Sequence, residues 1–425
     1  MTSTVDAAGP AFISHRSDDG TAAALDVARR FRSSGLPVWL DVDDLPPGDI
    51  VGRLDEALGA GLAGGVLVVT PNVVKSTVVR EQELPRLLAL AQDPTFTLAI
   101  VNEVAISSDP AAVDRAKAKE LLDPSDDHPE LGGLKQYSSI DGTLDQLGAW
   151  FARRRLDVLR AARPSDPLTI DIQTRVAAAA YRSRADLVFR SAPPPDGQRV
   201  LTPVVWADLQ RFLGWLPSIV ANVAPPSIVL SGGSHLSAAV ALGAALPSTA
   251  GIPVAVATKD ATWRLAGRDL TLRERLPIIG IAPRTRNVAG GSGPALAVFI
   301  DVAHSDGPVD TFGAWARANE GLFARAIVIS QRRRLEPEVG PLITHSIVQR
   351  IRREARAVDT RDVLLFVRAP WQLAVLLGMS LNTLTLRLFE WEDSTASPSY
   401  VPAAVVRSGA GGSPVIEVAG APAVP

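Results

Sequence analysis

The sequence predicts an α/β protein of at least two domains, in which parallel sheets are covered by helices on both faces. Short apolar runs alternate with helical segments through residues 11–160, as in AFIS (11–14), GGVLVV (64–69) and FTLAIVN (96–102). This alternation is typical of a parallel sheet whose strands are buried on both sides. The length of 425 residues also exceeds what one ordinary hydrophobic core holds.

Composition excludes several classes of function. The formal net charge of -2 gives no overall attraction to DNA or to an anionic membrane, so we expect neither as a partner. The chain has no cysteine, and its five histidines show no metal-ligand spacing, so we expect no metal site. The N-terminus lacks the features of a signal peptide, and Pro247, Gly251 and Pro253 interrupt the apolar tract 236–258. We therefore expect a cytoplasmic protein.

The first half reads as strands and helices in regular order. A helix over 19–34 stops at Gly35 and leads into PVWLD (37–41), and further helices are expected near 50–60, 76–92 and 111–122. QYSSID (136–141) supplies the last strand, and an amphipathic helix covers 143–163. RPSDP (163–167) then breaks the pattern, so we place one domain at 1–163 and a second at 168–425.

Polar residues gather where the first strands end. Ser14 and Arg16 follow the first strand, and Asp41 follows PVWLD. Because ligands of parallel sheets bind beyond the carboxyl ends of the strands, these residues are expected to border one cleft. The helix after the strand GGVLVV carries two carboxylates, Glu81 and Glu83, which are either cleft residues or solvated helix charges.

The order of AFISHRSDDG (11–20), the acidic loop DVDDLPPGD (41–49) and KSTVVREQELPRLL (75–88) resembles that of a TIR domain. The resemblance implies a flavodoxin-like fold and the hydrolysis of NAD to nicotinamide and ADP-ribose or a cyclic form. NAD is then a substrate, and no cofactor is needed. The family glutamate is usually followed by an aliphatic residue, which favours Glu83 (before Leu84) over Glu81 (before Gln82) as the catalytic residue.

The same resemblance assigns substrate contacts and an assembly loop. Ser14, Arg16 and Asp41 would line the cleft, with Arg16 near the pyrophosphate. The tryptophan usual in the family is replaced by Val78 or Val79, so the predicted ring contacts pass to Phe12 and Trp39. The loop residues Asp43, Asp44 and Leu45 would contact a neighbouring copy, in a head-to-tail filament or a dimer. A non-enzymatic TIR adaptor remains the alternative interpretation.

The second half contains an internal repeat. SIVLSGGSHLSAAVALGAAL (227–246) aligns without a gap on DVLLFVRAPWQLAVLLGMSL (362–381), which places Val240 on Val375 and Gly243 on Gly378. Each copy is a strand, a loop, a helix and a further strand, namely PVAVAT (253–258) or TLRLFEW (385–391). We therefore expect two Rossmann-like lobes, over about 168–300 and 301–420, although any strand-loop-helix-strand unit shares part of this pattern.

LLFVRAPWQLAVLLGMSLN followed by LRLFEWE resembles the SAVED domain, a fusion of two CARF-like lobes. The resemblance implies a sensor of cyclic di-, tri- or tetranucleotides, with a trinucleotide favoured, in a TIR–SAVED effector of CBASS-type antiphage defence. A metabolic nucleotide-binding enzyme with a catalytic second half is the further alternative. A cyclic nucleotide needs cations, backbone N–H groups and stacking rings. The residues at strand ends that could supply them are Ser231, Gly232, Gly233, Ser234, Lys259, Arg332, Arg333, Phe366, Arg368 and Trp391.

Overall fold

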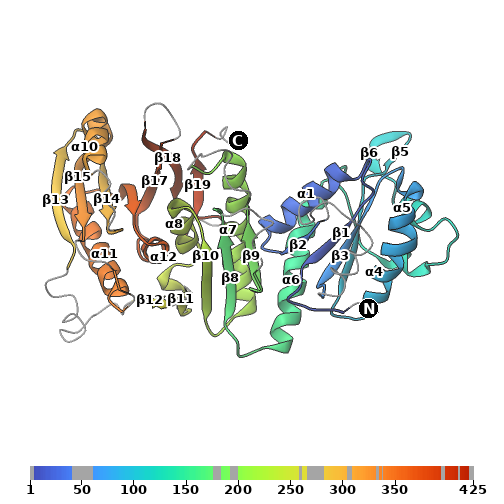
Figure 1. The fold of residues 1–425 in the computed structure, drawn as a ribbon. Helices are drawn as coiled ribbons and strands as arrows, with labels where there is room; N and C mark the ends of the chain where they lie inside the picture. The colour runs from blue at the N-terminus through green and yellow to red at the C-terminus, as the bar shows by residue number, and fades with distance from the viewer. Residues whose placement is uncertain are drawn as a thin grey trace. The chain divides into compact units, whose positions relative to one another are not determined.

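The computed structural model describes residues 4–40, 61–175, 183–191, 200–257, 261–265, 282–303, 309–331, 335–336, 338–393, 398–409 and 412–420. They form two compact units (Figure 1). The first comprises residues 1–165 and 177–191, and the second comprises residues 166–176 and 192–425. The main part of the first unit thus ends at residue 165, and the unit also includes the later segment 177–191, which contains strand β9 (Leu187–Arg190).

The first unit is built on a parallel sheet in the order β2-β1-β3-β4-β7. Its strands are β1 (Ala11–Ser14), β2 (Val38–Trp39), β3 (Gly64–Val69), β4 (Thr97–Asn102) and β7 (Gln136–Tyr137). Its helices are α1 (Thr21–Ser33), a π-helix (Val78–Glu83) that continues into α4 (Leu84–Leu90), α5 (Arg115–Leu122) and α6 (Leu144–Ala162). This confirms the predicted doubly wound α/β fold.

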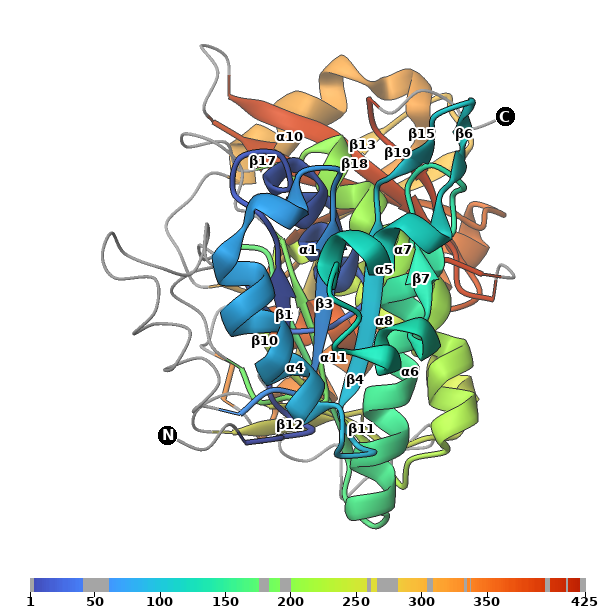
Figure 2. The ribbon, with the colours of Figure 1, turned by 90° about the vertical axis from the view of Figure 1, so that its right-hand side faces the viewer.

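Helices cover both faces of this sheet. A Cβ added to Gly64 would meet Phe151 of α6, and one added to the next residue, Gly65, would meet Leu87 of α4. Because successive residues of a strand point to opposite faces, α6 and α4 lie on opposite sides of β3. Figures 1 and 2 show α1 beside α6 and α5 beside α4.

Two expected helices of the first half need comment. The helix expected near 50–60 lies outside the described residues. The helix expected over 111–122 begins only at Arg115, because Asp114 caps it by accepting a hydrogen bond from the Lys117 N–H at 3.0 Å. The residues before it form a short hairpin of β5 (Ala105–Ile106) and β6 (Asp109–Val113) instead.

The second unit contains two sheets. In the first, neighbouring strands follow the order β12-β11-β10-β8. These are β8 (Leu168–Gln173), β10 (Ile228–Gly233), β11 (Val254–Ala257) and β12 (Thr262–Arg264). Helix α7 (Pro203–Val223) precedes β10, and α8 (Leu236–Ala245) follows it.

The second sheet has the order β13-β15-β14-β16-β17-β18-β19. Its strands are β13 (Arg284–Gly290), β14 (Ala295–Asp301), β15 (Phe323–Ser330), β16 (Asp362–Arg368), β17 (Thr385–Glu392), β18 (Ser399–Val406) and β19 (Val415–Val418). Its helices are α10 (Val309–Ala318), α11 (Gly340–Ala357) and α12 (Trp371–Ser380). The second lobe therefore begins with β13, upstream of the expected boundary near residue 300.

The repeat predicted from the sequence is confirmed. The first copy forms β10, α8 and β11, and the second forms β16, α12 and β17, with parallel strand pairing in both. Helices α8 and α12 are apolar nearly all round, and such helices are buried on every side. They pack against each other between the two sheets (Figure 1). Among the described residues, we find no helix with the length and apolar character needed to span a membrane.

Candidate functional site

The centre of the first candidate site is a contact between Ser14 and Glu83. Ser14 ends β1, and its Oγ donates a hydrogen bond to Oε2 of Glu83 at 2.5 Å. The two side chains are 1% and 8% exposed, respectively. Both side chains are thus shielded from water, and a lower dielectric strengthens the electrostatic interactions around them.

The local helix geometry separates Glu83 from Glu81. Val78–Glu83 is a π-helix, in which Val79 and Glu83 are buried while Glu81 is exposed. A π-turn takes up one more residue than an α-turn and is frequent at functional sites. Of the two glutamates, Glu83 is therefore the buried one, and it is the one that contacts Ser14.

The rings predicted to contact the substrate lie side by side. Phe12 pairs with Trp39 across β1 and β2, and their ring centroids are 5.3 Å apart. Phe12 is buried in the core, whereas Trp39 is only partly buried, so Trp39 is the ring that remains accessible. Asp41, Asp43, Asp44 and Leu45 lie outside the described residues.

Arg16 is held by acidic neighbours. Its guanidinium pairs with Asp18 and donates to Asp19 Oδ1 at 3.0 Å, and Asn72 Nδ2 donates to the other oxygen of Asp19 at 3.0 Å. Partial burial acts to raise the pKa of Asp19, but hydrogen bonds from Arg16, Asn72 and Thr70 lower it overall. With two carboxylates beside it, Arg16 offers little net positive charge to a pyrophosphate.

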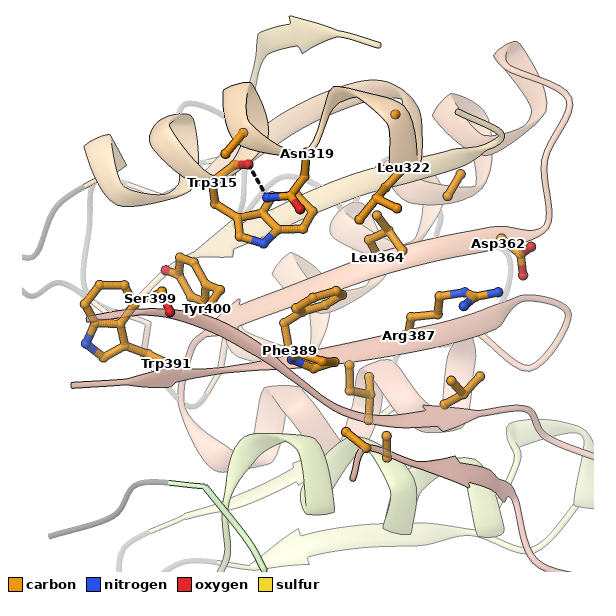
Figure 3. A pocket seen from close by; sticks show the side chains of 18 of the residues that line it. Trp315, Asn319, Leu322, Asp362, Leu364, Arg387, Phe389, Trp391, Ser399 and Tyr400 are labelled. Atoms are coloured by element: carbon orange, nitrogen blue, oxygen red, sulfur yellow. Dashed lines mark hydrogen bonds between the residues drawn. The ribbon is translucent and has the colours of Figure 1, made fainter. Parts of the chain in front are cut away.

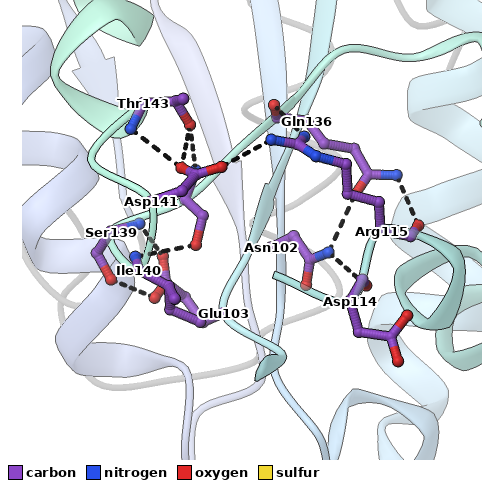
Figure 4. A network of polar contacts seen from close by, with 10 residues as sticks. Asn102, Glu103, Asp114, Arg115, Gln136, Ser139, Ile140, Asp141 and Thr143 are labelled. Atoms are coloured by element: carbon purple, nitrogen blue, oxygen red, sulfur yellow. Dashed lines mark hydrogen bonds and ion pairs between the residues drawn. The ribbon is translucent and has the colours of Figure 1, made fainter. Parts of the chain in front are cut away.

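A pocket of about 450 Å³ opens at the carboxyl ends of the same strands, and it is acidic. Asp19, Asp26 and Glu103 line it together with Thr70 and Ser139. Ser139 donates from its backbone N–H and its hydroxyl to Glu103, within a polar network that Figure 4 shows. Arg115 closes that network by donating to Asp141 at 2.7 Å. Its carboxylates would repel a phosphate group, so this pocket is poorly suited to a phosphorylated ligand.

The second candidate site lies where β8 and β10 of the second unit end. Ser231 Oγ donates to Asp171 Oδ2 at 2.8 Å, across the paired strands. Gly232 has a φ of 111°, and a Cβ there would lie 2.1 Å from the carbonyl oxygen of Ile172. Only glycine fits this conformation and this close approach, so Gly232 fixes the path of the loop.

The helix start after this loop is already occupied by protein groups. The N–H of His235 donates to Thr174 Oγ1 at 3.0 Å, and the N–H of Ser237 donates to Glu390 Oε1 at 2.9 Å. Glu390 comes from β17 of the other lobe. Backbone N–H groups expected to receive a phosphate therefore bind a hydroxyl and a carboxylate here.

Two titratable groups of this junction are shifted by burial. Burial raises the pKa of the Glu390 carboxyl, although hydrogen bonds from Ser237 and the charge of Arg175 oppose the shift. Burial, together with the charge of Arg175, lowers the pKa of His235 to about 4. His235 is thus neutral at physiological pH, and its Nδ1 lies 2.8 Å from Thr174 Oγ1. Trp371 Nε1 donates to Ser234 Oγ at 2.7 Å and links the two helix starts.

Arg175 is a candidate that the sequence analysis missed. It follows β8, and the N–H of the preceding Thr174 donates to the Gly233 carbonyl at 3.2 Å. Its side chain is exposed, and no described carboxylate forms an ion pair with it. The sequence could have pointed to Arg175, because it follows the apolar strand LTIDIQ (168–173) by two residues, just as Arg16 follows AFIS (11–14).

The candidates of the second lobe fall in different environments. Arg368 binds Asp301 through two hydrogen bonds of 2.8 and 2.7 Å. Phe366 is fully buried among other rings, so it offers no face to a ligand in this arrangement. Trp391 packs on Tyr400 with ring centroids 5.1 Å apart. Lys259, Arg332 and Arg333 lie outside the described residues.

A pocket of about 840 Å³ lies between α10 and the face of β16, β17 and β18 (Figure 3). Trp315, Phe389, Trp391 and Tyr400 give it aromatic walls, and Arg387 lies toward one end. Its size and apolar lining are those of a small-molecule pocket. Within the described part of the chain, no group of three His, Asp or Glu side chains is arranged to hold a metal ion.

Comparison with known families identifies both units. Residues 11–131 match the model of the TIR domain, and residues 210–406 match that of the "SMODS-associated and fused to various effectors sensor domain", SAVED. No curated protein matches the chain at a significant level.

Solved structures with related folds include two Cap4 SAVED/CARF-domain receptors. That from Acinetobacter baumannii, with the cyclic trinucleotide 2'3'3'-cAAA, is 15% identical, with a TM-score of 0.45 over 93% of this chain and 87% of that one. That from Moraxella osloensis is 14% identical, with a TM-score of 0.41 over 84% and 83%. On the strength of the two family models, the chain is a fusion of a TIR domain with a SAVED sensor domain.

Proposed function

We propose that the chain is an NAD hydrolase that a cyclic oligonucleotide activates. The observation that carries the proposal is the buried hydrogen bond of 2.5 Å between Ser14 and Glu83, at the strand end where a TIR substrate would enter. It supplies a fixed, desolvated carboxylate in the predicted cleft.

Cleavage of the glycosidic bond of NAD requires few further groups from the protein. The glycosidic C–N bond of NAD breaks, and its electron pair goes to the pyridinium nitrogen, so that nicotinamide leaves as a neutral molecule. The ribose carbon develops oxocarbenium character, which the negative charge of Glu83 stabilises. Water then adds to that carbon and loses a proton, which gives ADP-ribose. Alternatively, adenine N1, a ring nitrogen that is not bonded to ribose, adds to the same carbon in place of water and gives the cyclic form. Ser14 orients the carboxylate, and Trp39 supplies a ring beside the nicotinamide.

The sensor half receives the activator, for which we favour a cyclic trinucleotide. Arg175 supplies an exposed positive charge beside the Ser231–Ser234 loop for the ring phosphates. Trp391 and Tyr400 supply rings for a base, on the face of β17 opposite Glu390. Consumption of NAD on binding would starve an infected cell, in keeping with CBASS-type defence.

Activation proceeds in this proposal by self-association into a head-to-tail filament. Asp43, Asp44 and Leu45 would contact the next TIR domain, because an apolar Leu45 is poorly suited to an exposed loop tip. Replacing Asp44 and Leu45 together should abolish NAD cleavage while the sensor still binds nucleotide. Light scattering beside a thermal melt separates a lost assembly from a misfolded chain.

The decisive experiment measures nicotinamide release by the full chain with a panel of cyclic di-, tri- and tetranucleotides. We expect cleavage only with the correct nucleotide. Glu83→Gln should lower the rate by about 10²-fold or more, because it keeps the volume but removes the charge. Glu81→Gln, on an exposed side chain, should retain activity. Nucleotide-driven assembly without any nicotinamide release would instead identify an adaptor.

A further inference from the structure

Glu390 joins the two lobes of the sensor unit at the start of α8. It lies on β17 of the second lobe, whereas α8 belongs to the first lobe. Its Oε1 accepts a hydrogen bond of 2.9 Å from the backbone N–H of Ser237 and one of 2.5 Å from the Ser237 hydroxyl. One carboxylate oxygen of the second lobe therefore takes up both donors that Ser237 offers in the first turn of α8.

Neighbouring donors are bound within the first lobe itself. The His235 N–H donates to Thr174 Oγ1 at 3.0 Å, and Ser231 Oγ donates to Asp171 Oδ2 at 2.8 Å. Asp171 belongs to β8, which pairs with β10, so these partners are part of the same sheet as the loop. Ser237 differs from Ser231 and His235 because its donors are held by a group from the other lobe. That group can leave without disturbing the pairing of β8 with β10.

The carboxylate of Glu390 lies in a positive field that also attracts other anions. The N–H groups of the first helical turn give the start of α8 a partial positive charge. Burial raises the pKa of Glu390 and lowers that of His235, and the positive charge of Arg175 lowers both. The charge of Arg175 thus reaches the helix start and the carboxylate together. A phosphate that binds beside the Ser231–Ser234 loop is attracted by the same two sources of positive charge.

A phosphate and the Glu390 carboxylate exclude each other at this helix start. The N–H and the hydroxyl of Ser237 each carry one proton, and both protons are engaged by Glu390. Two anions side by side would also repel each other, and the repulsion is stronger where water is partly excluded, as it is around the partly buried Glu390. A phosphate that takes these donors must therefore displace Glu390. The free energy of the displaced bonds is lost from the free energy of ligand binding.

We propose that Glu390 is an internal competitor, which occupies the start of α8 in the absence of the activator and sets the concentration of cyclic nucleotide at which the sensor responds. The proposal rests on the proposed function, in which a phosphate of the activator binds beside the Ser231–Ser234 loop. Because the apparent affinity falls with the fraction of molecules that are ready to bind, a strongly held Glu390 raises the threshold for activation. Displacement of Glu390 also breaks a contact between the two lobes, so binding of the nucleotide changes how the lobes are held together.

The test removes the charge of the competitor in the full chain. Glu390→Gln keeps the size of the side chain, but its neutral amide binds the start of α8 less strongly than a carboxylate does. The first probe is 3'3'3'-cAAA, followed by the other members of the cyclic di-, tri- and tetranucleotide panel. We expect the probe to bind Glu390→Gln about tenfold or more tightly than the wild type by calorimetry. The nucleotide concentration that gives half-maximal nicotinamide release should fall by the same factor.

Glu320→Gln is the matched control, because it changes the net charge equally through an exposed side chain of the second lobe. It should bind the probe as the wild type does. A Glu390→Gln chain that binds the probe with the same affinity as the wild type, or more weakly, would overturn the proposal. If a thermal melt finds Glu390→Gln unfolded, Glu390→Asp decides, since its carboxylate is one methylene group shorter and falls short of Ser237. Tighter binding by Glu390→Asp supports the competitor, and equal or weaker binding overturns it.

The two proposals fail in different ways. A wild-type chain that binds no member of the panel refutes the proposed sensor function. A wild-type chain that binds a nucleotide without releasing nicotinamide refutes the proposed NAD cleavage, while calorimetry still tests Glu390. A wild-type chain that is activated, beside a folded Glu390→Gln chain of equal affinity, refutes only the competitor.

Discussion

Gly243 of α8 and Gly378 of α12 occupy reciprocal positions in the packing of the two sensor lobes. A Cβ on Gly243 would lie 2.0 Å from the carbonyl oxygen of Val375, and a Cβ on Gly378 would lie 2.0 Å from that of Val240. Val240 and Val375 are themselves equivalent in the repeat, so each helix presents its glycine to the same carbonyl of the other. The helices thus meet backbone to backbone about a pseudo-twofold axis.

We expect Gly243→Ala and Gly378→Ala to destabilise the sensor unit, because a methyl group cannot fit at either contact. Alanine ordinarily stabilises a helix by about 0.5–1 kcal/mol relative to glycine, but overpacking costs about 1–3 kcal/mol or more. Gly313→Ala of α10 is the control, since its Cβ would meet nothing nearer than 3.6 Å. Urea denaturation measures the free energy of unfolding of all three variants. If Gly243→Ala and Gly378→Ala proved as stable as Gly313→Ala, the close packing of the two helices would be contradicted.

The equivalence of these glycines is visible in the sequence, but their contact is not. The repeat is visible because a strand followed by an apolar helix has the same pattern in both copies. Whether the two helices touch depends on tertiary packing, about which a single helix pattern says nothing. Strand β13 belongs to the sheet of the second lobe, but few of its residues are buried, so no apolar run marks it in the sequence.

We expect Ser14→Ala to lower the rate of NAD cleavage by about tenfold, less than Glu83→Gln, because the charge remains but its orientation is lost. The effect should fall on kcat rather than on KM. Ser17→Ala, three residues further along and exposed, is the control. Nicotinamide release at saturating nucleotide measures both variants. An unchanged kcat for Ser14→Ala would show that the hydrogen bond does not position Glu83.

The site itself was predictable only in part. Ser14 could be found because it ends a strand, and Glu83 was preferred over Glu81 because the family glutamate is usually followed by an aliphatic residue. The π-helix that brings Glu83 inward could not be found, since one extra residue in a turn leaves no periodic signal. Arg16 looked free in the sequence, but its pairing with Asp18 and Asp19 depends on the course of the loop.

We expect Arg175→Gln to weaken the activating nucleotide by about tenfold or more, the cost of one charge-assisted hydrogen bond. The apparent affinity should also depend less steeply on salt, because one fewer cation faces the phosphates. Arg353→Gln, an exposed arginine of α11, is the matched control of equal charge. Titration of nicotinamide release at several salt concentrations tests this. Parallel salt curves for both variants would remove Arg175 from the site.

The last prediction concerns the stability of the sensor unit in acid. The pKa of His235 is lowered from 6.5 to about 4 in the folded chain, chiefly by burial. A group with a lowered folded pKa binds more protons when unfolded, so its contribution is complete above the unfolded pKa and is lost as pH falls through the folded one. We therefore expect the free energy of unfolding to drop by about 3 kcal/mol between pH 7 and pH 4 through His235. His235→Asn cannot titrate, while its side-chain oxygen can still accept from Thr174. Its stability should fall less over the same window, measured by urea denaturation at each pH. Equal losses in both chains would mean that His235 does not carry the acid sensitivity of this junction.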